Sequence, residues 1–196
     1  MENSFKYRAF ITYAHEDENQ ARWLRKKLEG FPIPKNLVGG KGKFGKIPSR
    51  LYPIFRDRDE LPGSAQLGSV IEEALHDSSH LIVLCSPNAV KSRWVNEEIR
   101  LFKKMGKEDR ILCLILDGEP MADDLTHSKG KECLPLAVRR KIDADGSLID
   151  EIDEPGAADL RVSGDGEKNA ILKIVAGLLG IGLDEIKQRD MIARQR

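Results

Sequence analysis

Three apolar runs of strand length constrain the fold of this chain more than any other feature. They are YRAFITY (residues 7–13), HLIVLC (80–85) and RILCLIL (110–116). The second and third are almost continuously apolar, which is typical of strands buried on both faces of a sheet. Segments with apolar residues at helical spacing lie between the runs. Strands that alternate with helices predict right-handed crossovers, and therefore a mostly parallel, doubly wound α/β sheet covered on both faces.

Ordinary capping residues bound the predicted helices. Asp17 is expected to cap the first helix with its carboxylate, and Gly30 to end it. Ser92 is expected to cap a later helix. A second strand is expected over residues 51–55. Because Pro53 within it lacks an N–H donor, this strand should be short or irregular.

The length and patterning predict one domain with a helical extension. A chain of 196 residues can bury a core without disulfides or metals. We expect residues 1–120 to form the core of the domain, and the polar residues 121–166 to complete it as a variable segment. The apolar spacing in residues 167–196 predicts two C-terminal helices, which could join a further region.

The composition disfavours several classes of function. Lys+Arg and Asp+Glu both number 32, so no basic excess suggests nucleic-acid binding. No apolar run approaches the length of a membrane span, so this segment is not expected to enter a membrane. The three cysteines, Cys85, Cys113 and Cys133, include no Cys-x-x-Cys pair. We interpret them as reduced, packed thiols of a cytoplasmic protein.

The loop over residues 31–50 carries five bases and no acid. Within it, Gly40, Gly42 and Gly45 match the Gly-x-Gly-x-x-Gly pattern of phosphate-binding loops. Such loops need a strand before them and a helix after them, whereas here a helix and a Pro-rich stretch precede the glycines. A flexible basic loop is the better interpretation, and its lysines could still touch an anionic ligand or partner. The acidic cluster at 15–18 is typical of a helix N-terminus, and no metal site is expected.

Trp94 and Glu98 form the candidate ligand site. They follow the buried run 80–85, and ligands of doubly wound sheets bind beyond the carboxyl ends of the strands. Their i, i+4 spacing puts them on one helix face, where an aromatic wall beside an acid suits a ribose that bears a planar base. The carboxylate could stabilise positive charge at the anomeric carbon. Spacing alone slightly favours the alternative of a helix-dipole acid and a core tryptophan.

Three segments, in this order, resemble the Toll/interleukin-1 receptor (TIR) domain family. They are FITYAHED (residues 10–17), IFRDRDELPGS (54–64) and LIVLCSPNAVKSRWVNEEI (81–99). The last contains the family's Ser-x-Trp-x-x-x-Glu signature, with Ser92, Trp94 and Glu98 all in register. The resemblance is strongest with prokaryotic members, which also tend to carry a helical tail. It implies a flavodoxin-like, five-stranded parallel sheet flanked by helices, with a C-terminal helical extension.

Enzymatic members of this family cleave NAD+ at the nicotinamide–ribose bond, and some cyclise or transfer the ADP-ribose. The resemblance therefore implies an NAD+-cleaving enzyme of prokaryotic anti-phage signalling, with NAD+ as substrate and neither metal nor other cofactor. Glu98 matches the catalytic glutamate, whereas Glu97 is out of register. Tyr13, Asp57 and Trp94 match positions near the substrate. A packing role for Tyr13 and a turn-bonding role for Asp57 are equally compatible with the sequence.

The resemblance also implies self-association through TIR–TIR contacts, because activity in the family often requires assembly. The basic insert over residues 31–50 is longer than the usual loop at this place, so it could reshape or cover the pocket. A non-catalytic TIR adaptor is the alternative function, in which Glu98 would be only a helix acid.

Overall fold

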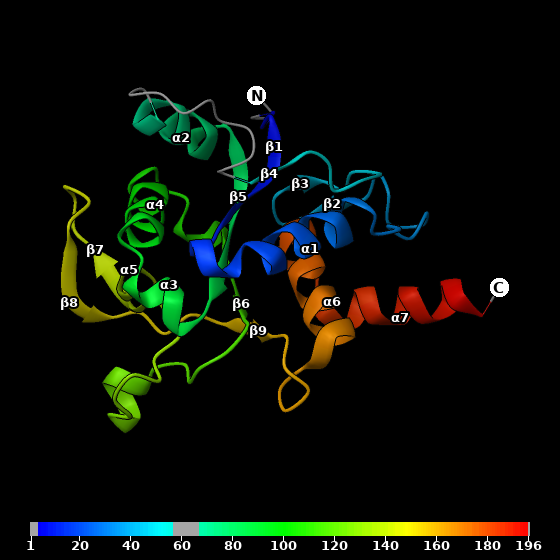
Figure 1. Cartoon of the computed structure of the whole chain (residues 1–196). Helices are drawn as coiled ribbons and strands as arrows, with labels where there is room; N and C mark the ends of the chain where they lie inside the picture. The colour runs from blue at the N-terminus through cyan, green and yellow to red at the C-terminus, as the bar shows by residue number, and fades with distance from the viewer. Residues whose placement is uncertain (1–3, 57–66, 196) are drawn as a thin grey trace.

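A five-stranded parallel sheet forms the centre of the computed structural model, which describes residues 4–56 and 67–195 (Figure 1). Its strands are β1 (Tyr7–Thr12), β4 (Ile54–Arg56), β5 (Ser78–Cys85), β6 (Ile111–Ile115) and β9 (Ala157–Asp159). They lie in the order β4-β1-β5-β6-β9, and all pairs are parallel. This is the flavodoxin-like strand order, in which the second strand of the sheet lies at one edge. The predicted fold class is confirmed.

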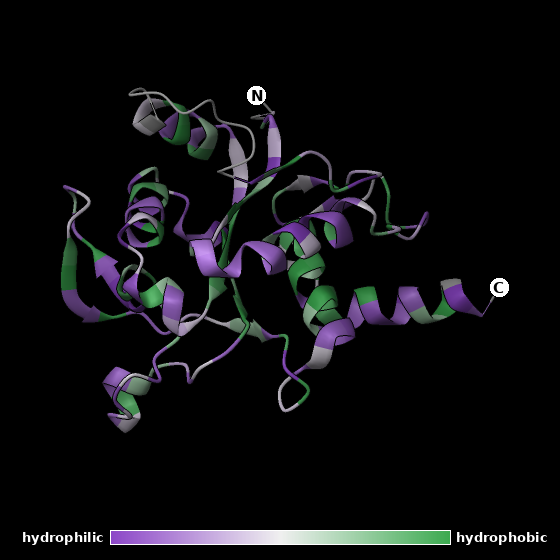
Figure 2. Cartoon of the chain, in the orientation of Figure 1, coloured by the Kyte–Doolittle hydropathy of each residue, from purple (hydrophilic) through white to green (hydrophobic). Residues whose placement is uncertain are grey.

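Helices cover both faces of the sheet. One face packs against α1 (Glu18–Glu29) and α6 (Gly166–Leu179), and α6 is predominantly apolar (Figure 2). The other packs against α2 (Leu67–His76), α3 (Pro87–Lys91), α4 (Arg93–Lys104) and α5 (Leu136–Arg139). The last helix, α7 (Leu183–Arg194), extends away from the body of the domain (Figure 1). None of the helices in the described ranges is long and apolar enough to cross a membrane.

Two strands differ from the sequence prediction. The strand expected over residues 51–55 spans Ile54–Arg56 instead, because Pro53 cannot donate to a neighbouring strand and only the residues after it pair with β1. The fifth strand, β9, lies in the polar segment 121–166 and was not recognised. It has only three residues at the edge of the sheet, so it needs no apolar run like those of the central strands.

The rest of the segment between β6 and β9 forms a side layer. It contains a π-helical turn (Ala122–Thr126) and an antiparallel hairpin of β7 (Arg140–Ile142) and β8 (Leu148–Ile152). The Lys103 ammonium on α4 anchors this hairpin by donating to the backbone carbonyl of Arg140 at 2.8 Å. The same ammonium lies 3.1 Å from the Asp153 carboxylate. The hairpin therefore stands beside α4 and outside the central sheet.

The basic insert contains a second hairpin, made of β2 (Lys41–Gly42) and β3 (Gly45–Lys46). It packs against the end of α6, where the Lys43 N–H donates to the Gly180 carbonyl at 2.8 Å. A Cβ on Gly42 would lie 2.0 Å from the Leu179 carbonyl oxygen, so only glycine permits this approach. The glycines thus serve a hairpin and its docking. They do not form the strand–turn–helix unit of a phosphate-binding loop.

Candidate active site

Glu98 lies in the second turn of α4 and points at the end of β1. Its side chain is only 4% exposed. The Thr12 hydroxyl, on the last residue of β1, donates to Glu98 Oε2 at 2.5 Å. Thr12 itself is fully buried. A strand that is fixed on both sides by β4 and β5 therefore holds one oxygen of the carboxylate in place at the carboxyl edge of the sheet.

The three residues of the Ser-x-Trp-x-x-x-Glu signature have different surroundings at the start of α4. The Ser92 hydroxyl accepts a hydrogen bond from the Val95 N–H at 3.3 Å, which is the predicted cap. Glu98 faces the sheet, whereas the Trp94 side chain is 60% exposed. Trp94 is therefore not a core residue, contrary to the structural alternative, and its ring is available to a ligand or partner.

The two adjacent glutamates have different environments. Glu97 forms hydrogen bonds through both carboxylate oxygens to the Arg100 guanidinium, at 2.6 and 2.9 Å. This bonding to Arg100 lowers the pKa of Glu97. Glu97 is thereby bound on the outer surface of α4, while Glu98 is buried against Thr12. The two carboxylates differ in burial and partner, although they are neighbours in the sequence.

A buried hydrogen bond joins two loops at the same edge. The Ser86 hydroxyl, directly after β5, donates to Asp17 Oδ2 at 2.5 Å, and it also accepts from the Ala89 N–H as the cap of α3. The expectation that the Asp17 carboxylate caps α1 is wrong, since it makes no capping hydrogen bond. Its oxygen binds Ser86 instead, which ties the loop after β1 to the loop after β5.

Arg56 is a component of this edge that the sequence did not single out. It is the last residue of β4, pairs in register with Ile11, and is 3% exposed. Its Nη1 lies 3.7 Å from Glu18 Oε1. The signal for it was available, because the last residue of any strand in a parallel sheet lies at the ligand-binding edge. A buried guanidinium there supplies positive charge near Glu18, at the start of α1.

Of the two remaining predicted site residues, the structure describes Tyr13 and does not describe Asp57. Tyr13 follows Thr12 directly, and its side chain is 1% exposed within the core on the α1 and α6 side. Asp57 lies outside the described residues. The structure therefore brings Tyr13 and Glu98 to the same end of β1, with Trp94 one turn before Glu98 on the surface of α4.

The basic insert lies at the amino ends of the strands, whereas Glu98 lies at their carboxyl ends. The Phe44 ring contacts the ring of His80, near the start of β5, with centroids 4.6 Å apart. Glu98 instead contacts the final residue of β1. Since the strands are parallel, their two ends define separate edges, and the expectation that the insert reshapes or covers the pocket is wrong. The insert follows α1, and a crossover helix returns the chain to the amino ends of the strands.

The cysteines are free, buried thiols, as expected from the sequence. Burial, reinforced by the neighbouring Glu132 carboxylate, raises the pKa of Cys133 to about 12. The pKa of Cys85 is raised well above its usual value by its contact with Cys113 and by burial. Cys85 and Cys133 therefore stay protonated near neutral pH, which makes them poor nucleophiles.

Known proteins are similar to this chain over residues 10–120 or over almost its whole length. Residues 10–120 match the family described as "Thoeris protein ThsB, TIR-like domain". NAD(+) hydrolase ApTIR of Actinoplanes sp. is 26% identical over 202 aligned residues, covering 97% of this chain and 26% of that protein. Toll-like receptor 4 of Sus scrofa is 33% identical over 88 residues, covering 45% of this chain and 9% of the receptor. The chain thus spans about a quarter of ApTIR and less of the receptor.

Among solved structures, the chain resembles the TIR domains in the activated Roq1 resistosome that directly recognizes the pathogen effector XopQ. The TM-score is 0.49 at 18% identity, over 85% of this chain and 96% of that one. The match to the family covers more than half of the 196 residues and includes the second half of β1, the signature and α4. The chain belongs to the TIR-like domain family of the Thoeris protein ThsB.

Proposed function

We propose that this domain cleaves NAD+ at the bond between nicotinamide and ribose, with Glu98 as the catalytic residue. The observation that carries the proposal is the buried Glu98 carboxylate, held by Thr12 at the ligand-binding edge of the sheet. Similarity to an NAD(+) hydrolase along 97% of the chain supports the same chemistry. A fixed carboxylate at this place suits the cleavage of a bond that leaves positive charge on the ribose.

The reaction places few demands on the protein. When the C1′–N bond breaks, its electron pair goes to the nicotinamide ring, which leaves as a neutral molecule. The positive charge that develops on the ribose is stabilised by the Glu98 carboxylate. Water then adds at C1′ and releases a proton, which completes hydrolysis. Because the leaving group is already cationic in NAD+, no general acid is required, and the mechanism depends on positioning and electrostatics.

Three further residues are proposed to contact or shape the substrate site. The exposed Trp94 ring can stack on a planar base, one turn from Glu98. Tyr13 packs in the core on the α1 and α6 side, directly after Thr12, so it would shape the site by supporting the end of β1. Asp57 follows Arg56 in the sequence, and its carboxylate could accept hydrogen bonds from ribose hydroxyls.

Glu98→Gln tests the assignment, with Glu97→Gln as a matched control on the same helix. Incubation of each variant with NAD+, followed by chromatographic measurement of nicotinamide, gives the rate. Loss of a preorganised charge should lower the rate of Glu98→Gln by about 10²-fold or more. Glu97→Gln should stay within a few-fold of wild type, because Glu97 is bound to Arg100 on the outside of α4. Unchanged cleavage in Glu98→Gln would overturn the proposal.

The products and the biological setting form the finer part of the proposal. The same ribosyl cation can be captured by water or by an intramolecular or external nucleophile, which would give linear, cyclic or conjugated ADP-ribose. Mass spectrometry of the product mixture distinguishes these three. We further propose a role in prokaryotic anti-phage signalling, with self-association through TIR–TIR contacts, as the resemblance to prokaryotic TIR domains implies. Phage challenge of cells that carry the wild-type gene or Glu98→Gln tests that role.

A non-catalytic interaction module is the second candidate, favoured by the 88-residue similarity to Toll-like receptor 4 and by the exposed Trp94. This alternative predicts that NAD+ remains intact in the presence of wild-type protein at any concentration. It also predicts that Glu98→Gln leaves binding to other TIR domains unchanged.

A further inference from the structure

The chain is neutral overall, but its charges are segregated. The insert over residues 31–50 has five bases and no acid, whereas residues 140–154 have six acids and two bases. Figure 1 places β7 and β8, which belong to the acidic segment, on one side of the molecule. The insert and α7 lie on the opposite side. The molecule therefore has a basic end and an acidic end.

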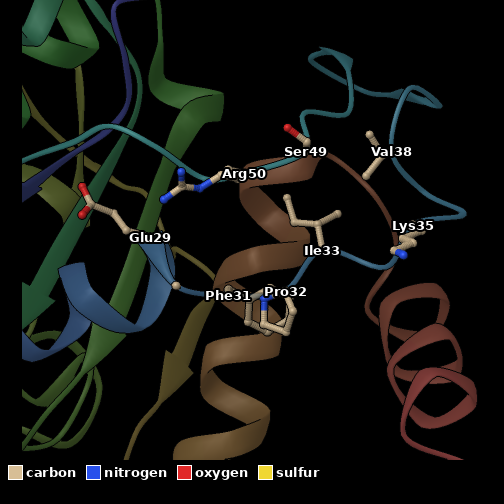
Figure 3. Close-up of a pocket in the computed structure, with 9 residues that line it drawn as sticks. Glu29, Phe31, Pro32, Ile33, Lys35, Val38, Ser49 and Arg50 are labelled. Atoms are coloured by element: carbon tan, nitrogen blue, oxygen red, sulfur yellow. The ribbon is translucent and has the colours of Figure 1, made fainter. Parts of the chain in front are cut away.

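The basic end contains a groove between the insert and α7. Two cavities of about 620 and 750 Å³ meet there, since both are lined by Pro32, Ile33 and Lys35. Figure 3 shows Ile33 between Arg50 on one side and Lys35 on the other. We define the basic groove by six residues: Pro32, Ile33, Lys35, Val38, Arg50 and Arg189. Its floor is apolar and its rim is cationic.

The three cations of the basic groove lack acidic partners among the residues that the structure describes. Lys35, Arg50 and Arg189 form no ion pair with any other residue in the described ranges. Two acids also line these cavities, and both have partners: Glu29 Oε1 accepts from the Ile54 N–H at 3.0 Å, and Asp190 lies 3.0 Å from Arg194. The groove therefore has positive charge available for an acidic partner.

The acidic end presents a surface of complementary character. β8 pairs only with β7 in the part of the chain that the structure describes, which leaves its outer edge open. Ile152 at the end of β8 is 50% exposed, and the Asp150 side chain is fully exposed. Asp150 lies 3.6 Å from Arg140 and Glu151 contacts Lys141, but exposed ion pairs of this kind contribute little to stability. We call the exposed surface of residues 148–154 the acidic hairpin.

We propose that the acidic hairpin of one copy binds the basic groove of the next, so that copies assemble head to tail. Ile152 would enter the groove beside Val38, while Asp150 and Glu151 meet Lys35 and Arg50. Charge complementarity sets the orientation and speeds the encounter. The two surfaces are different and lie on opposite sides, so the contact does not close on itself and generates a chain of copies.

Sedimentation velocity of the 196-residue chain tests this contact at graded protein and salt concentrations. Wild type should grow in mass with concentration and shrink with added salt. Lys35→Glu/Arg50→Glu and Asp150→Lys/Glu151→Lys should each stay monomeric, because each loses one end of the contact. An equimolar mixture of the two variants should regain assembly, because the intact hairpin of the first meets the intact groove of the second. The two reversed surfaces also carry opposite charges and can pair, so the two variants should alternate along the chain of copies.

Combining all four substitutions in one chain should restore assembly, because the charges at the two ends are then exchanged. Lys129→Glu and Glu72→Lys are matched charge reversals outside both surfaces and should assemble as wild type does. A wild-type chain that stays monomeric up to about 1 mM, where a contact of about 4 kcal/mol is detectable, would overturn the proposal. Assembly that is unaffected by both double variants would overturn it as well. Sedimentation reports mass alone, so this result does not depend on NAD+ cleavage.

Discussion

Thr12 is a positioning residue for Glu98, because its hydroxyl binds the carboxylate from the end of β1. Thr12→Val keeps the shape of the side chain and removes the donor. We expect kcat for NAD+ cleavage to fall about tenfold or more while KM changes little, since the loss of this bond loosens the group that stabilises the transition state. Thr12→Ser retains the donor and should recover most of the rate. Equal kcat for the valine and serine variants, at equal thermal stability, would contradict this role.

His80 makes the stability of the fold sensitive to acid. Its ring is 1% exposed, and burial, followed by the charges of Arg110, Lys107 and Lys43, lowers its pKa to about 3. The unfolded chain binds the proton near pH 6.5, so stability is complete above that pH and falls as the pH drops toward 3. The loss should reach about 2 kcal/mol at pH 5.

His80→Leu removes this titration. Urea unfolding of wild type and variant at pH 7 and pH 5 measures how much of the acid-induced loss of stability comes from His80. The difference between the two proteins cancels the contribution of the carboxylates that both contain. The variant should lose less free energy of unfolding between the two pH values than wild type does. An equal loss in both proteins would exclude His80 as the cause.

Docking of the β2–β3 hairpin on α6 depends on one glycine. Gly42→Ala places a methyl group 2.0 Å from the backbone oxygen of Leu179, so the hairpin must shift away from the helix. We expect a loss of about 1–3 kcal/mol in the free energy of unfolding, measured by urea titration. Gly68→Ala is the control, because its Cβ meets nothing within 4 Å and alanine favours helix α2. The control should raise stability slightly. NAD+ cleavage should persist in Gly42→Ala, since the β2–β3 hairpin lies at the opposite end of the strands from Glu98.

Assembly links the whole molecule to its activity. If a neighbouring copy completes or orders the pocket, dilute protein should be weakly active, and specific activity should rise with concentration. The rise should coincide with the growth in mass seen by sedimentation, and Asp150→Lys/Glu151→Lys should reduce it. Nicotinamide release per mole of protein, measured across the same concentrations, checks this expectation. Constant specific activity over that range would show that a single copy is sufficient.

The sequence by itself determined the class of the fold. The continuous apolar runs of β5 and β6 predict strands buried on both faces, and Ser92 and Gly30 mark helix ends, because burial and capping depend on residues close together in the chain. The resemblance to TIR domains directed attention to Glu98 before any contact was known. These features are local, so the chain carries them without reference to the final packing.

Only the tertiary structure decided which distant residues meet. Thr12 and Glu98 are 86 positions apart, and their contact depends on how α4 packs across β1. The three-residue edge strand β9, the Asp17–Ser86 bond and the placement of the insert at the far edge likewise follow from packing. The local sequence pattern predicts whether a residue is buried, but it does not predict which residue it will contact. The partner of a buried carboxylate is set by the register of strands and the packing of helices, which involve the whole chain.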